Sequence, residues 1–61
     1  MQTTKRERVE SLVKSYCKDF GREYDPSIMN FVSCIADSGG KLDVSQRFEI
    51  MYTVEKYFNM K

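Results

Sequence analysis

Hydrophobic residues recur with the period of an α-helix through most of this chain. In its first third they are separated by alternating steps of three and four, which places them on one stripe of a helix. Thr4 and Glu7 have the Thr-x-x-Glu spacing of a capping box, and Gly21 stands where a left-handed helix cap favours glycine. The pattern predicts a first helix over residues 4–20. Its apolar stripe consists of Val9, Leu12, Val13, Tyr16, Cys17 and Phe20.

A second helix is indicated by Asp25 followed by Pro26. The aspartate can cap free backbone amides, and proline at the first helical position gives up an N–H that has no partner there. Apolar residues then cover more than half of the helix circumference, which is typical of a central, buried helix. We predict this helix over residues 26–38, ended by Gly39 and Gly40. Its apolar positions are Ile28, Met29, Phe31, Val32, Ile35 and Ala36.

A third helix is predicted over residues 43–58, with Asp43 as its N-cap and Gln46 in the reciprocal position of the capping box. Its apolar residues form two stripes, displaced from each other by roughly one quarter to one third of a turn. The first stripe consists of Val44, Phe48, Met51, Tyr52 and Phe58, and the second of Ile50, Val54 and Tyr57.

The second stripe of this helix is the most informative feature for function. We expect the first stripe to face the core, so that Ile50, Val54 and Tyr57 are partly exposed, with Arg47 at their edge. An exposed apolar patch usually marks an interface, and tyrosine and arginine are common anchors of such surfaces. We therefore predict a dimer or partner interface at these four residues. The alternative is that the third helix lies in a groove between the other two and buries both stripes.

The fold class follows from the same pattern. No segment alternates with the period of a β-strand, and no linker divides the chain. We predict an all-α fold with one three-helix domain over residues 1–61, the second helix central, and a homodimer formed through the third. No apolar run approaches the ~20 residues that cross a bilayer, and no signal-peptide core is present, so we expect a soluble cytoplasmic protein without a membrane partner.

The residue types available argue against catalysis and against a bound cofactor. The chain has no histidine, no Gly-rich phosphate loop and no Gly-x-Ser-x-Gly turn. Three short helices are also expected to enclose too little volume for a pocket of a few hundred Å³. Cys17 and Cys34 lack metal-ligand spacing and are expected to be buried thiols. We predict that the protein is not an enzyme and needs no cofactor.

One stretch resembles a calcium-binding loop. From Ile35 to Gln46 the chain is similar to the helix–loop–helix of EF-hand proteins, with Asp37 at the third loop position and Gly40 at the sixth. The resemblance implies a calcium ion in this loop. The chain departs from the family at the ligands, because Ile35 occupies the first position and Gln46 replaces the bidentate glutamate. Ordinary helix capping accounts for the same residues, so we predict no metal.

Charge is distributed unevenly along the chain. The formal net charge is +1, but residues 1–22 hold six basic and three acidic side chains. The basic residues could contact phosphates or an acidic partner, or simply form a solvated helix face. They are Lys5, Arg6, Arg8, Lys14, Lys18 and Arg22. The overall hypothesis is a small regulator or inhibitor that binds a larger protein of unknown identity, and the alternative is a nucleic-acid-binding regulator that uses this first helix.

Overall fold

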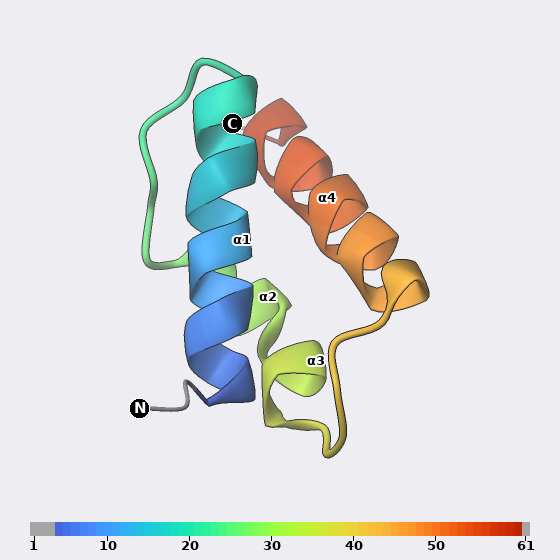
Figure 1. The fold of residues 1–61 in the computed structure, drawn as a ribbon. Helices are drawn as coiled ribbons and strands as arrows, with labels where there is room; N and C mark the ends of the chain where they lie inside the picture. The colour runs from blue at the N-terminus through green and yellow to red at the C-terminus, as the bar shows by residue number, and fades with distance from the viewer. Residues whose placement is uncertain (1–3, 61) are drawn as a thin grey trace.

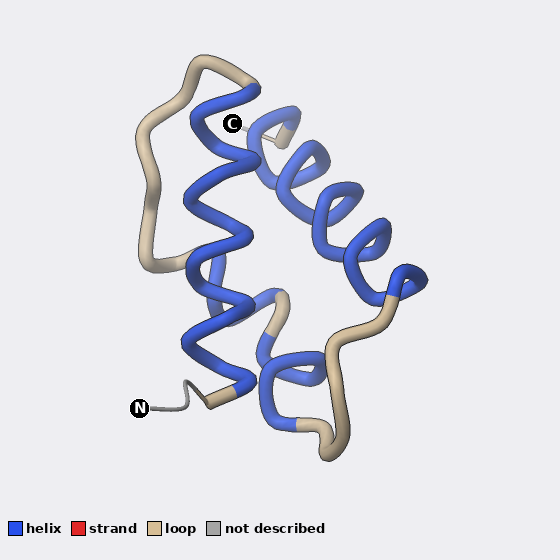
Figure 2. Tube along the Cα trace, viewed as in Figure 1, coloured by secondary structure: helices blue, strands red, loops and turns tan. Residues whose placement is uncertain are grey.

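The computed structural model describes residues 4–60, which form four helices and no strand (Figures 1 and 2). This confirms the all-α class. Two of the helices are long and two are single turns. The helices are α1 (Lys5–Asp19), α2 (Ile28–Phe31), α3 (Ser33–Asp37) and α4 (Val44–Asn59).

The two long helices form the frame of the molecule. They run in the same general direction, with their C-terminal ends close together and their N-terminal ends spread apart (Figure 1). The main helix–helix contact is between α1 and α4, while α2 contacts both long helices and α3 packs against α1. A connection from residue 20 to residue 27 leads back along α1, so that α2 and α3 lie beside its N-terminal half.

The C-terminal cap of α1 is formed as predicted, and at its N-terminus the Thr4 half of the predicted capping box is formed. The hydroxyl of Thr4 accepts a hydrogen bond from the backbone N–H of Glu7 at 3.2 Å. Gly21 has a φ of +70°, and the N–H of Arg22 donates to the carbonyl of Cys17 at 2.9 Å. These are the left-handed residue and the long backbone bond of a Schellman cap. The limits of this helix were therefore set by local interactions.

The helix predicted over residues 26–38 is instead two short helices that meet at Val32. The backbone of Val32 has φ −109° and ψ 9°, outside the helical region. The hydroxyl of Ser33 donates to the carbonyl of Asn30 at 3.1 Å. A serine that bonds to a nearby carbonyl competes with the helical backbone bonds, and the β-branched side chain of Val32 adds little helical preference. The three-helix count was wrong for this reason.

The start of α4 agrees with the prediction in part. The carboxylate of Asp43 accepts a hydrogen bond from the backbone N–H of Gln46 at 2.8 Å, as an N-cap residue should. The reciprocal bond of a capping box is not formed, because the side-chain oxygen Oε1 of Gln46 is buried and has no hydrogen-bond partner among residues 4–60.

The hydrophobic core joins all four helices, and it overturns the prediction for α4. Ile50 and Val54 are 0% exposed and Tyr57 is 6% exposed. These three residues therefore face the interior, and the partly exposed surface expected around them does not exist. The core residues are Val9, Val13, Cys17, Ile28, Met29, Val32, Ala36, Ile50, Val54 and Tyr57.

The reason for this orientation lies in the size of the facing side chains. α1 presents Val9, Val13 and Cys17 to the interior, and these are small enough for another helix to approach closely. The compact branched side chains of Ile50 and Val54 suit that contact better than the rings of the first stripe. The shape of the facing side chains, and not the number of apolar residues in each stripe, therefore determines which stripe of α4 is buried.

The second helix is also less central than predicted. Ile28, Met29, Val32 and Ala36 are buried, but Phe31 is 56% exposed. The apolar residues of the middle segment thus divide between the core and the surface. No helix within residues 4–60 is both long and apolar enough to span a bilayer.

Candidate interaction site

The largest apolar side chains left on the surface of α4 lie on one side of the helix. Val44, Phe48 and Tyr52 are 67%, 62% and 58% exposed. They are spaced four residues apart, so they occupy successive turns of one helix face. We refer to these three residues as the outer face of α4. It belongs to the first stripe of this helix, which was predicted to face the core.

A signal for this reversal was present in the sequence. The first stripe contains a charged residue, Glu55, which follows Phe48 and Met51 at helical spacing. No charged residue lies between Ile50 and Tyr57 on the second stripe. An uninterrupted stripe is the better candidate for the interior, because a buried carboxylate needs a partner.

The flank of the outer face carries charges of both signs. Glu49 and Lys56 are exposed and lie two turns apart, so they share one side of α4. The Nζ atom of Lys56 lies 5.0 Å from the centre of the Tyr52 ring, within range of a cation–π contact. The outer face therefore has an aromatic centre with an acidic and a basic residue along its edge.

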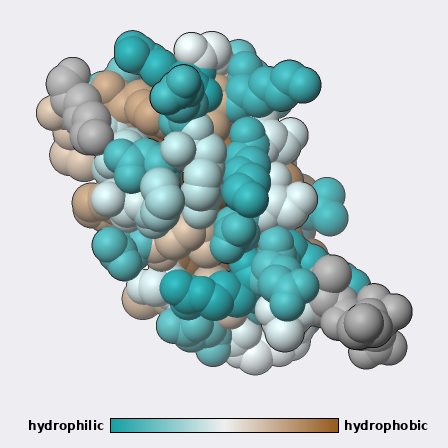
Figure 3. Space-filling view, turned by 90° about the vertical axis from the view of Figure 1, so that its left-hand side faces the viewer, coloured by the Kyte–Doolittle hydropathy of each residue, from teal (hydrophilic) through white to brown (hydrophobic). Residues whose placement is uncertain are grey.

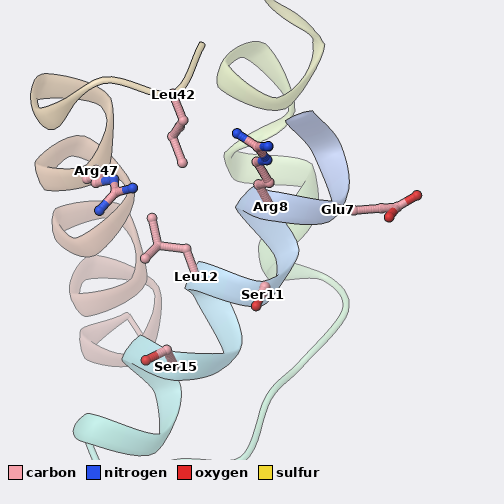
Figure 4. Close-up of a pocket in the computed structure, with 7 residues that line it drawn as sticks. All are labelled: Glu7, Arg8, Ser11, Leu12, Ser15, Leu42 and Arg47. Carbon is pink, nitrogen blue, oxygen red and sulfur yellow. The ribbon is translucent and has the colours of Figure 1, made fainter. Parts of the chain in front are cut away.

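A groove of about 550 Å³ lies where α1 and α4 diverge (Figure 4). Arg8 extends from α1 and Arg47 from α4 toward the space between the helices, and Leu12 and Leu42 lie between them. The carboxylate of Glu7 points away from this space. We call this feature the basic groove. Its lining residues are Glu7, Arg8, Ser11, Leu12, Ser15, Leu42 and Arg47.

The basic groove corrects the expectation that three short helices leave no room for a hollow of a few hundred Å³. Its volume falls in the range of small-molecule sites. It arises because the two long helices meet at one end and separate at the other. The hydroxyl of Tyr16 donates to the backbone carbonyl of Arg47 at 3.4 Å and helps to hold the first turns of α4 beside α1.

The first two basic residues of α1 contact the end of α3. The Nζ atom of Lys5 donates to the hydroxyl of Ser38 at 2.7 Å, and Arg6 forms an ion pair with Asp37 at 3.1 Å. Cations at the C-terminal end of a helix are favourable. Asp37, a ligand position of the calcium-loop resemblance, is thus paired with an arginine.

The remaining basic residues of the first 22 positions are exposed. Lys14 forms an ion pair with Glu10 at 3.2 Å and lies 5.3 Å from the ring centre of Tyr24. Arg22 lies 5.8 Å from the ring centre of Phe58. Lys18 forms no ion pair with any residue of the described range 4–60. The predicted phosphate-binding set is therefore divided among several contacts, and Arg8 points into the basic groove.

The outward surface of α1 and of the following connection is mainly polar. Hydrophilic residues predominate on the face seen in Figure 3, and apolar residues appear there as smaller areas between them. A second hollow of about 450 Å³ lies at the connection after α1. It is lined by Arg22, Glu23, Tyr24, Asp25, Pro26 and Phe58.

The two cysteines lie in different environments. Cys17 is buried, as predicted, and Cys34 is exposed, which corrects the prediction for that residue. Both are free thiols. Burial raises the pKa of the Cys17 thiol above its ordinary value, and the charge of Asp25 adds to this shift. Within residues 4–60 no three His, Cys, Asp or Glu side chains gather where a metal ion could be held.

In comparisons with known proteins, no family model matches the chain, and no curated protein or solved structure matches it significantly.

Proposed function

We propose that the protein is a non-catalytic interaction module, a small regulator or inhibitor that binds a larger protein and pairs with a second copy of itself. The observation that carries this proposal is the outer face of α4, where Val44, Phe48 and Tyr52 are each more than half exposed. Large apolar side chains grouped on one surface usually mark a binding site. The protein has two free thiols, Cys17 and Cys34. Free thiols are common in proteins of the reducing cytoplasm, and we propose that location for this protein.

A second copy fits this face because of its charges. In an antiparallel helix pair related by a two-fold axis, the same flank of each helix meets the same flank of its partner. Each Glu49 then lies opposite the other copy's Lys56, and the axis passes close to Tyr52. Glu55 lies on the outer face itself, one turn beyond Tyr52 and near the angular position of Phe48. The arrangement forms two ion pairs around an aromatic centre.

The expected dimer is weak. A standard interface covers about 800 Å² of each partner, roughly one sixth of this protein's 4591 Å² surface. One face of a 16-residue helix is smaller than that. We therefore expect a dissociation constant in the micromolar range, and sedimentation velocity over a range of protein concentrations will measure it.

Two pairs of variants test this interface. Phe48→Ser with Tyr52→Ser should give a folded monomer, whereas Met60→Ser removes an equally exposed apolar side chain beyond the face and should leave the dimer intact. Glu49→Lys should weaken the dimer, and combining it with Lys56→Glu should restore it. Wild-type protein that stays monomeric at hundreds of micromolar would refute the dimer.

Nucleic-acid binding is the second hypothesis for this protein. It would use the basic residues of α1, but Lys5, Arg6 and Lys14 contact polar or aromatic groups of their own chain. We expect no retardation of DNA or RNA on gels, even at low ionic strength. Retardation that weakens steeply with added salt would favour the nucleic-acid hypothesis instead.

A further inference from the structure

We propose that the basic groove binds an acidic segment of a partner protein, with carboxylates at Arg8 and Arg47 and an apolar side chain on Leu12 and Leu42. This inference rests on the proposed protein-binding function and names the chemistry of the partner. It concerns a surface separate from the outer face of α4.

The charge of the groove determines the sign of its ligand. Two arginines reach into it from different helices, and the nearby acid Glu7 points away from it (Figure 4). Arginine binds carboxylates through two parallel hydrogen bonds, which gives both strength and orientation. Ser11 and Ser15 line the same groove, and a serine hydroxyl can donate one hydrogen bond to an acceptor.

The shape and floor of the groove favour a peptide segment over a lone small anion. Along α1 the lining runs from Glu7 to Ser15, nine residues or about 12 Å of helix. An extended segment of three to four residues has the same length. The leucine side chains between the two arginines provide an apolar surface that an inorganic anion cannot use.

The experiment uses a defined peptide as the probe. Acetyl-Glu-Glu-Leu-Leu-Glu-Glu-amide is titrated into the ¹⁵N-labelled full chain, and amide chemical shifts are followed by NMR. We expect saturable shifts at Arg8, Ser11, Ser15 and Arg47. The same peptide with glutamine in place of glutamate should give shifts at least tenfold weaker at equal concentration. Inorganic phosphate should not saturate these amides in the same concentration range.

Variants of the groove test whether the acidic peptide binds there. Arg8→Gln with Arg47→Gln should weaken peptide binding at least tenfold, whereas Lys18→Gln, an exposed cation of α1 outside the groove, should leave it unchanged. If the double variant fails to fold, the wild-type shift map and the glutamine peptide decide the question by themselves. Three results would overturn the proposal: no binding of the acidic peptide, equal binding of the glutamine peptide, or equal binding of phosphate.

The test is independent of the dimer. It is repeated on the variant that carries Phe48→Ser and Tyr52→Ser, where the basic groove is unchanged. Peptide binding by a monomeric wild-type protein would retain the groove proposal and reject the dimer. A dimeric wild-type protein that binds no acidic peptide would retain the dimer and reject the groove proposal.

Discussion

Tyr57 shows how one side chain can fix the position of several elements. Its ring lies in the core and packs against the ring of Phe31 with centres 5.6 Å apart. Its hydroxyl donates to Asp25 at 2.6 Å, and the other oxygen of that carboxylate accepts the N–H of Ser27 at 2.9 Å. The end of α4 is thereby joined to the connection before α2.

Removing the hydroxyl of Tyr57 tests how much its hydrogen bond to Asp25 contributes to the stability of the fold. Tyr57→Phe keeps the ring but leaves the carboxylate of Asp25 without this donor, so we expect a loss of about 1.5–3 kcal/mol in the free energy of unfolding. Tyr52→Phe, at an exposed position, should change it by less than about 0.5 kcal/mol. Urea denaturation followed by circular dichroism measures both. Equal effects would show that the bond to Asp25 contributes nothing.

The two thiols should differ in reactivity. A disulfide reagent added to native protein should modify Cys34 quickly and Cys17 only when the protein unfolds. Because burial raises the pKa of Cys17 in the folded state, its contribution to stability is constant below the ordinary thiol pKa of 9.0 and falls as pH rises above it. Cys17→Ala should reduce this alkaline loss. Equal modification rates for the two thiols in native protein would contradict the structure.

At the scale of whole elements, the sequence was informative where short-range interactions decide the structure. Thr4, Gly21 and Asp43 were identified as cap residues because a cap depends on neighbours within a few positions. The break at Val32 was missed, since it depends on a serine hydroxyl that can point in several directions. The buried side of α4 was also missed, because it depends on what α1 presents to it.

Two glycines provide a matched test of these caps. Gly21 has a φ of +70°, and a side chain there meets no other atom within 4 Å, so Gly21→Ala costs backbone strain alone. We expect a loss of about 1–2 kcal/mol in the free energy of unfolding. Gly39 lacks a positive φ and has the same open surroundings, so Gly39→Ala should be neutral or stabilising by up to about 1 kcal/mol. Urea denaturation of both variants gives the comparison.

At the scale of the whole molecule, function depends on what the fold leaves uncovered. The basic groove could not be predicted, because Arg8 and Arg47 come together only through the divergence of two helices distant in sequence. The expectation that Ile50, Val54 and Tyr57 form surplus apolar surface is wrong, because all three are buried. The exposed apolar residues of the last helix are instead those of the outer face of α4. When apolar residues cover most of a helix's circumference, the neighbouring elements determine which side of the helix is buried.

If the outer face of α4 pairs with a second copy, stability must depend on protein concentration. At concentrations well above the dissociation constant, a tenfold increase adds about 1.4 kcal/mol per dimer, or about 0.7 kcal/mol per protomer. For a domain of this size that raises the midpoint of thermal unfolding by about 3–6 °C. The variant with Phe48→Ser and Tyr52→Ser should show one midpoint at every concentration, because its folded state is monomeric. A wild-type midpoint that does not move across the micromolar range would mean that the exposed rings stay in solvent, and the binding role would then depend on the basic groove.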